Sequence, residues 1–339
     1  MAKKIIKKIL FTFLFISITF LTLFITLSLY FRVDSIFVAS VAILLFLLSY
    51  VAVVFHLKRL SSWSIYAVFV AIWFYWYATV HPSNERIWQK DVAVLSYATI
   101  NDTLITVHNI RNFSYTSEDN YEAHYYDETY DINTLQGIDF IATYWMGSAI
   151  AHTFLSFSFA DGKHLAISIE VRKKQGESYS MIRGFFRENE LYYVVADERD
   201  LIGLRTNIRE NPPEQVYMYQ INAKTEDMKK VFLNYMQKIN DLKNTPEFYN
   251  TLTTNCTTTI WNNSLVNYSD MRFSWEILLS GYSARYLYKN GLLKTYGLNF
   301  EELQKRAYIN PLVDSQAIDA NFSSKIRANE RQMLKNPLY

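Results

Sequence analysis

The first candidate for chemistry in this chain of 339 residues is its one cysteine, Cys256. It lies in the segment TLTTNCTTTIWNNSLV, which begins polar and becomes apolar at Ile260, as expected of a helix that begins at Thr254 or Asn255. A thiol in the first turn of a helix feels the positive end of the helix dipole, which lowers its pKa and increases the reactive thiolate fraction. Cys256 is therefore either a nucleophile or a small buried residue that follows ordinary helix caps.

A cysteine nucleophile needs a base, usually histidine, and a polar group that orients the imidazole. Among the six histidines, His152 is the best candidate, because it begins a largely apolar strand where an unpaired imidazole would lose solvation. A satisfied core histidine fits the same pattern. The strand segments AHTFLSFSF and HLAISIEVR flank Asp161-Gly162, a dipeptide that favours tight hairpin turns. A loop at residues 160–162 would place Glu170 opposite His152 as the orienting carboxylate, whereas other registers place it diagonally or on the other face.

Further residues are candidates for substrate binding, namely Asn255, Arg172 and Arg205. Arg205 follows a charged cluster at residues 197–200, for which a solvated loop is the favoured interpretation. The acidic, histidine-containing stretch at residues 122–128 matches no strong metal-ligand spacing. We therefore expect no metal site and no other cofactor.

The elements that would position these residues follow from hydrophobic periodicity. Strands are expected at residues 91–100, 102–110, 151–159, 164–172, 185–196, 203–209 and 216–222, and an apolar segment at residues 138–146 precedes the hairpin. From Thr225, capped by its own hydroxyl, an amphipathic helix is predicted with one apolar face: Met228, Val231, Phe232, Tyr235, Met236, Ile239 and Leu242. The fold class is therefore α+β, with an antiparallel sheet followed by the helix that carries Cys256.

The first eighty residues are unlike the rest of the chain. Uncharged apolar runs at residues 9–31, 35–55 and 61–80 are each long enough to cross the roughly 30 Å hydrocarbon layer as a helix. A cleaved signal peptide is the alternative for the first run, but the run is too long and no small-residue cleavage site follows it. Three transmembrane helices at residues 1–81 are therefore predicted to anchor a domain at residues 82–339.

Basic residues in the short flanks set the expected orientation, because such flanks stay in the cytoplasm. They comprise Lys3, Lys4, Lys7 and Lys8 before the first run, Arg32 after it, and Lys58 and Arg59 before the third. With three crossings, residues 82–339 would lie beyond the inner membrane, in the periplasm of a Gram-negative cell. The net charge of +2 lacks the basic field that nucleic-acid binding requires.

Long segments resemble one known family. HTFLSFSFADGKHLAISIEVRKKQGESY, FFRENELYYVVADERDLIGLRTN and PEFYNTLTTNCTTTIW are similar, in this order, to the Lnb-type N-terminal periplasmic domain, over most of residues 85–295. The resemblance implies a circularly permuted relative of the papain and NlpC-like cysteine enzymes, with His152 before Cys256. In the related lecithin-retinol acyltransferases a second histidine commonly lies twelve positions on. His164 has that spacing but lies beside the hairpin tip, so Glu170 is preferred.

The resemblance also implies an activity. Lnb proteins are lipoprotein N-acyltransferases, so the expected enzyme takes an acyl chain from a phospholipid, forms a thioester on Cys256, and transfers the chain to a lipoprotein amine. The three predicted spans depart from the membrane segments of better-known members, which leaves the acceptor open. A cysteine hydrolase, acting as an amidase or peptidase on envelope substrates, and a non-catalytic binding module are the alternatives.

Overall fold

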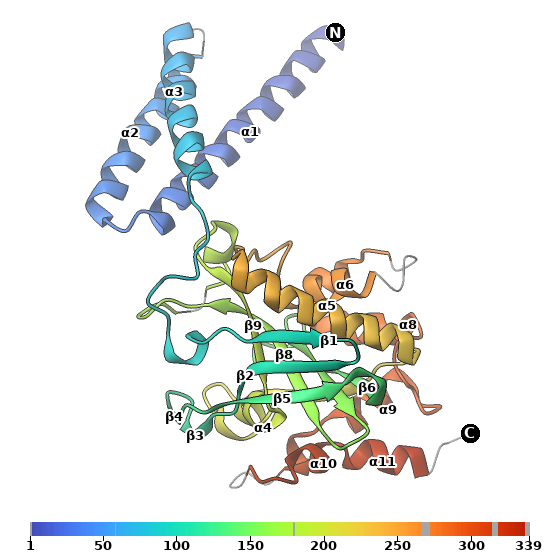
Figure 1. Cartoon of the computed structure of the whole chain (residues 1–339). Coiled ribbons are helices and arrows are strands. Elements are labelled where there is room, and N and C mark those ends of the chain that lie inside the picture. Colours follow the sequence, from blue (N-terminus) through green and yellow to red (C-terminus); the bar gives the residue numbers. More distant parts are fainter. Residues whose placement is uncertain (1, 58, 179, 266–271, 314–317, 336–339) are drawn as a thin grey trace. The chain divides into compact units, whose positions relative to one another are not determined.

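The computed structural model describes residues 2–57, 59–178, 180–265, 272–313 and 318–335. The chain divides into two compact units. One comprises Met1–Ser83 and Ser180–Asn189, and the other comprises Asn84–Tyr179 and Glu190–Tyr339. Figure 1 shows that the first unit is helical and that the second contains the sheet with helices packed on it.

The helical unit contains α1 (Ala2–Arg32), α2 (Ile36–Phe55) and α3 (Leu60–Ala78). Among the described residues, two helices, Lys3–Arg32 and Ile36–Phe55, are long and apolar enough to cross a membrane. Only 17% and 22% of their most apolar windows are buried, whereas a core helix of a water-soluble domain would be mostly buried. Their exposed apolar surface therefore suits lipid, and the chain has a membrane-anchoring segment at its N-terminal end.

Of the three predicted membrane spans, those at α1 and α2 are supported. A helix does form over the third run, but α3 does not reach the same hydropathy as α1 and α2. The physical reason is its composition, since Ser, Trp and Tyr side chains interrupt its aliphatic residues. The spans were predicted from long runs without charged residues. Such a run can be an aromatic, hydroxyl-rich helix as well as an aliphatic one.

The polar side chains of α3 bond to α1. The Tyr66 hydroxyl lies 2.9 Å from Thr22 Oγ1, and Trp73 Nε1 donates to Ser28 Oγ at 2.7 Å. Along α3 Tyr66 comes before Trp73, and along α1 their partners Thr22 and Ser28 come in the same order. The two helices therefore run parallel. Hydrogen bonds of this kind satisfy polar groups between helices in an apolar environment.

A segment from the second half of the chain packs on the same helices. Within Ser180–Asn189, the Phe186 ring lies 5.4 Å from that of Phe31, and the Arg187 guanidinium lies 4.8 Å from the centre of the Tyr77 ring. Phe31 is near the C-terminal end of α1 and Tyr77 is near that of α3. The segment therefore joins the ends of α1 and α3 that lie away from the basic N-terminus.

The second unit is built on a largely antiparallel sheet of eight strands in the order β1-β2-β9-β8-β7-β6-β10, with β5 paired to β2. β2 and β9 are the parallel pair. The strands are β1 (Tyr97–Asn101), β2 (Leu104–Arg111), β5 (Tyr125–Asp131), β6 (Leu135–Tyr144), β7 (His152–Phe159), β8 (His164–Arg172), β9 (Glu190–Ala196) and β10 (Gln215–Gln220). A separate hairpin consists of β3 (Ser114–Ser117) and β4 (Asn120–Glu122).

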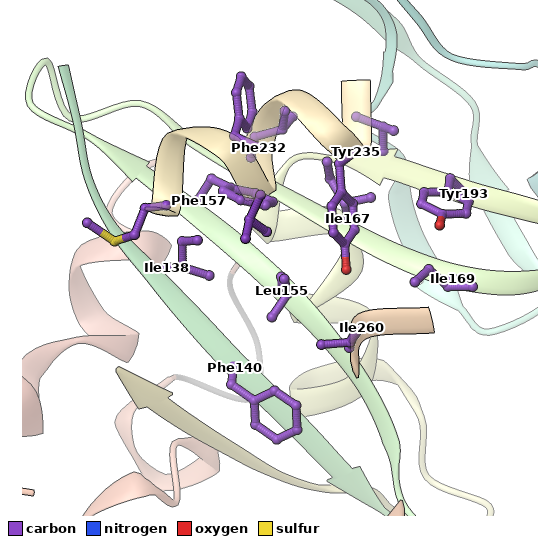
Figure 2. Close-up of a cluster of buried hydrophobic side chains, with 14 of the residues drawn as sticks. Ile138, Phe140, Leu155, Phe157, Ile167, Ile169, Tyr193, Phe232, Tyr235 and Ile260 are labelled. Atoms are coloured by element: carbon purple, nitrogen blue, oxygen red, sulfur yellow. The ribbon is translucent and has the colours of Figure 1, made fainter. Parts of the chain in front are cut away.

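Except for the short α4, which lies between β9 and β10, the helices of this unit follow the strands in sequence, as expected of an α+β domain. They are α4 (Glu198–Leu201), α5 (Thr225–Asn244), α6 (Cys256–Leu265), α7 (Trp275–Leu278), α8 (Ser283–Lys289), α9 (Phe300–Ala307), α10 (Phe322–Ile326) and α11 (Ala328–Lys335). The apolar face predicted for α5 is confirmed, because all seven of its residues are buried. Figure 2 shows Phe232 and Tyr235 of this helix against Phe157 and Ile167 of the sheet. Thr225 is the first residue of α5 and does not cap it, since Lys224 holds the cap position without a side-chain bond.

One predicted strand is wrong. Residues 203–209 form no strand but a short π-helical turn, η4 (Leu204–Ile208), directly after α4. Its backbone groups bond locally, with Arg205 N donating to Ile202 O and Arg209 N to Leu204 O. Alternating apolar residues suggested a strand there, but period-2 alternation over so few residues also fits a tight turn that buries Leu204. This difference decides where Arg205 points.

Candidate active site

The hairpin of β7 and β8 brings His152 and Glu170 together. Phe154 pairs with Ser168, and the same register continued by two residues puts His152 opposite Glu170. The loop is residues 160–162, closed by a hydrogen bond from Phe159 N to Lys163 O. This is the register in which the sequence places the two side chains directly across from each other. Both then project from the same face of the sheet.

Helix α6 places Cys256 at its first position. Asn255 precedes the helix, and its Oδ1 accepts a hydrogen bond of 2.8 Å from Thr258 N, as an N-cap does. The next residue, Thr257, bonds to Thr153 of β7 through hydroxyl oxygens 2.9 Å apart. A buried side-chain bond thus holds the start of the helix against the strand that begins with His152.

The Cys256 thiol has the environment of a nucleophile. Burial raises its pKa, but the charge of His152, a hydrogen bond with that ring and a backbone hydrogen bond from Thr153 outweigh this effect. The resulting pKa is lowered to about 7. The first turn of a helix adds a favourable dipole in the same direction. A substantial fraction of Cys256 is therefore thiolate near neutral pH.

The imidazole of His152 is held from its other side. Its Nε2 lies 2.6 Å from Ser168 Oγ and 3.0 Å from Glu170 Oε1, which leaves Nδ1 for the thiol. Burial lowers the pKa of His152, but the charge of the Glu170 carboxylate outweighs this effect. The resulting pKa is raised to about 9. For the Glu170 carboxyl group burial raises the pKa, but the charge of His152 outweighs burial and brings this pKa well below its usual range. Between about pH 7 and pH 9 the site therefore holds a thiolate beside an imidazolium.

The sequence around these three residues matches the model of a known protein family. The model of the Lnb N-terminal periplasmic domain matches residues 121–290, half of the chain and the part that holds His152, Glu170 and Cys256. The chain belongs to this family. The match confirms the resemblance and identifies the sheet-containing part as a periplasmic-type domain. No curated protein and no solved structure matches the chain.

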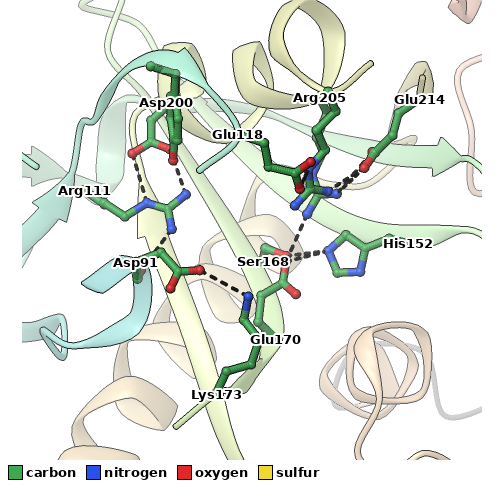
Figure 3. A network of polar contacts seen from close by, with 12 residues as sticks. Asp91, Arg111, Glu118, His152, Ser168, Glu170, Lys173, Asp200, Arg205 and Glu214 are labelled. Atoms are coloured by element: carbon green, nitrogen blue, oxygen red, sulfur yellow. Dashed lines mark hydrogen bonds and ion pairs between the residues drawn. The ribbon is translucent and has the colours of Figure 1, made fainter. Parts of the chain in front are cut away.

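In this Lnb-type domain Arg205 stands behind the carboxylate. Its Nη2 lies 3.0 Å from Glu170 Oε1, and its Nη1 lies 3.2 Å from Glu214 Oε2. Figure 3 shows the guanidinium near both carboxylates, and dashed lines join His152 to the Ser168 and Glu170 side chains. Arg205 is 5% exposed, so it is poorly placed to bind substrate directly. The sequence singled out this residue but not its contact with Glu170.

The other proposed substrate-binding residues have structural roles. The Arg172 guanidinium is buried, donates to the carbonyls of Val92 and Ala93, and lies 4.2 Å from the centre of the Trp88 ring. None of these contacts is with His152, Glu170 or Cys256, so a role of Arg172 in substrate binding stays a prediction. The Asn255 side chain is occupied by the cap of α6, which is the ordinary role considered for it from sequence.

Sequence reasoning missed Ser168 in this Lnb-type domain. Its hydroxyl donates to Glu170 Oε1 at 2.8 Å and lies 2.6 Å from His152 Nε2, so it bridges the two. The available signal was the period of the strand, since residues two apart on β8 share a face. His164 lies further along this face, where its Nδ1 is 3.0 Å from Ser158 Oγ.

A metal centre would need several His, Cys, Asp or Glu side chains close together. No group of three or more His, Cys, Asp or Glu side chains that could hold a metal ion occurs among the described residues. In the stretch considered from sequence, Asp127 pairs with His108, with Oδ2 and Nδ1 2.7 Å apart.

Proposed function

We propose that the chain is a membrane-anchored, cysteine-dependent acyltransferase of the bacterial envelope. The observation that carries the proposal is the arrangement of Cys256 at the start of a helix, His152 beside it and Glu170 behind the imidazole. A thiolate beside an oriented imidazolium is the form in which cysteine enzymes attack acyl groups. The phospholipid donor and the lipoprotein acceptor follow from the resemblance to Lnb proteins.

The proposed first half-reaction forms a thioester. The Cys256 thiolate attacks the ester carbonyl carbon of a phospholipid, and backbone N–H groups at the start of α6 stabilise the developing oxyanion. When the C–O bond breaks, the His152 imidazolium gives its proton to the leaving lysophospholipid oxygen. The neutral imidazole is then ready to act as a base.

The second half-reaction returns the site to its starting form. The amine of a lipidated N-terminal cysteine attacks the thioester carbonyl, His152 accepts a proton from the nitrogen, and the Cys256 thiolate leaves. An amide forms and the thioester breaks, with no oxidant or cofactor required. Glu170 keeps the imidazolium in position through both halves, because its carboxylate pairs with Nε2 and accepts the hydrogen bond of Ser168, whose hydroxyl also contacts Nε2.

An exposed apolar surface near the site favours lipid substrates over soluble ones. Phe273, Trp275 and Leu278 are 52%, 57% and 41% exposed, in and before helix α7. The Phe273 ring packs on Trp261 of the nucleophile helix at 5.2 Å. Large exposed aromatic and aliphatic side chains are typical of surfaces that contact membranes or apolar ligands. Acyl chains are such ligands.

The proposed location is the inner membrane with the domain in the periplasm. The Lys-rich N-terminus favours the cytoplasm, so a periplasmic domain requires an odd number of crossings. Because α3 runs parallel to α1 and bonds to it at two depths, we propose that α3 is the third span despite its lower hydropathy. An anchor keeps the enzyme beside lipid-embedded donor and acceptor and raises their effective concentration.

The test is transfer by the full chain in lipid nanodiscs. The assay supplies a phospholipid with a labelled acyl chain and a diacylated lipopeptide with a free N-terminal amine, and mass spectrometry measures the N-acylated product. Cys256→Ser is expected to lose transfer. The control is Ser264→Ala on the same helix. The Ser264 hydroxyl donates to the Ile260 carbonyl of its own helix, so this variant is expected to keep transfer. Transfer retained in Cys256→Ser would exclude the proposal, and free fatty acid without N-acylated peptide would favour the hydrolase.

A further inference from the structure

Two cations share one oxygen atom behind the nucleophile. His152 Nε2 and Arg205 Nη2 each lie 3.0 Å from Glu170 Oε1, and they approach it from different elements. His152 belongs to β7, whereas Arg205 belongs to the turn η4. Figure 3 shows the carboxylate between the imidazole and the guanidinium. Arg205 therefore pairs with the same carboxylate oxygen that forms the ion pair with the imidazole.

Further charges hold Arg205 in place. Glu214 Oε2 lies 3.2 Å from Arg205 Nη1, and Glu214 Oε1 lies 2.5 Å from Arg209 Nη1. Arg209 also pairs with Glu118 at the turn after β3, at 2.9 Å. The side chains of Arg205 and Glu214 are 6% and 4% exposed, so solvent screens their interaction little. Charges therefore alternate in sign from Glu118 to His152, and Arg205 has little freedom to turn toward a substrate.

We infer that Arg205 is a positioning residue that fixes Glu170 and limits how strongly this carboxylate holds the imidazole proton. The inference rests on the proposed function, in which His152 must give up and regain that proton. A carboxylate shared with a second cation stabilises the imidazolium less than an unshared one. The titratable and charged groups that face the imidazole are Glu170 from β8, Arg205 from η4 and Cys256 from α6. Of these, Arg205 alone opposes protonation by its charge.

The experiment titrates His152 directly in the full chain. Carbon-13 labelled histidine is incorporated, the protein is held in detergent micelles, and the His152 resonance is assigned from its loss in His152→Gln. In Arg205→Met the titration midpoint is expected to rise by roughly one pH unit, the size of effect that one neighbouring charge produces. Arg205→Lys keeps the positive charge and is expected to return the midpoint toward that of the wild type.

The control is Arg199→Met, because Arg199 of α4 pairs at 3.0 Å with Asp197, the residue that caps this helix. Its midpoint should match the wild type. In Arg205→Met, Glu170 keeps His152 and Glu214 keeps Arg209, so no carboxylate of the network is left without a cation. If this variant does not fold, the double variant Arg205→Met/Glu214→Gln removes one charge of each sign and is titrated instead.

The outcomes separate this inference from the proposed function. A midpoint that stays or falls in Arg205→Met, or that moves equally in Arg205→Lys, would overturn the role given to Arg205. That result would leave the thiolate–imidazolium pair untouched. A Cys256 labelling rate that does not change in His152→Gln would instead remove the proposed function, whatever the Arg205 variants show.

Discussion

At the scale of single residues, the site depends on two pKa shifts in opposite directions. The pKa of His152 is raised to about 9, mainly by the charge of Glu170, and the pKa of Cys256 is lowered to about 7, mainly by the charge of His152. The order of the two values matters more than either alone. Because the imidazole loses its proton at higher pH than the thiol does, the charged pair exists without any substrate.

This order predicts a bell-shaped pH profile for acyl transfer. The pKa of Cys256 is lowered, so the thiolate and the activity are lost as pH falls through about 7. The pKa of His152 is raised, so the imidazolium and the activity are lost as pH rises through about 9. The measurement is the rate of thioester formation in a single turnover from pH 5 to pH 10. Glu170→Gln removes the charge that raises the His152 pKa, so its alkaline limb should move to lower pH. A wild-type profile with one limb near the free-cysteine value of roughly 8.5 would contradict the charged pair.

At the scale of elements, the start of α6 determines where the thiol lies. The cap by Asn255 fixes the first turn, and the bond between Thr257 and Thr153 fixes that turn against β7. The hairpin of β7 and β8 supplies the imidazole and carboxylate from one face. The proposed nucleophile and its base therefore come from two elements that the bond between Thr257 and Thr153 holds together.

Two substitutions at the cap should separate stability from reactivity. Asn255→Ala removes the cap oxygen and is expected to lower the free energy of unfolding by about 1 kcal/mol. Asn255→Asp keeps a cap oxygen but adds a negative charge beside the nucleophile, so the pKa of Cys256 should rise. Thermal unfolding and the pH dependence of Cys256 labelling by iodoacetamide measure the two effects. An unchanged labelling profile in Asn255→Asp would show that the cap side chain does not influence the thiol.

At the scale of the whole molecule, the anchor decides on which side of the membrane the domain lies. α1 and α3 run parallel, and the segment Ser180–Asn189 contacts the C-terminal ends of both. If α1 crosses the bilayer from the cytoplasm, α3 follows the same direction. The domain after α3 then emerges on the opposite side from the basic N-terminus.

Protease access to spheroplasts tests this topology. The domain is expected to be digested from outside, while a tag at the N-terminus is protected until the membrane is broken. A second tag between α2 and α3 serves as the control and should also be protected, because the proposed topology puts that connection on the cytoplasmic side. Protection of the domain together with the N-terminal tag would show an even number of crossings and would exclude α3 as a span.

The sequence by itself determined the features that depend on near neighbours. The buried face of α5 follows from a period of 3.6 residues, and the β7–β8 hairpin follows from alternation around Asp161 and Gly162. The start of α6 follows from polar caps before an apolar run. These patterns also selected His152, Glu170 and Cys256, because a hairpin register and a helix start are local properties.

Only the tertiary structure decided how distant side chains share partners. The contact of Arg205 with Glu170 joins residues 35 positions apart, and it depends on η4, which alternation alone made look like a strand. From sequence, Arg172 was as plausible a substrate ligand as Arg205, and only the structure shows its guanidinium bonded to the carbonyls of Val92 and Ala93. The physical reason is that composition and spacing show which groups a chain carries. The pairing of buried charges is instead set by packing between elements that sequence order does not bring together.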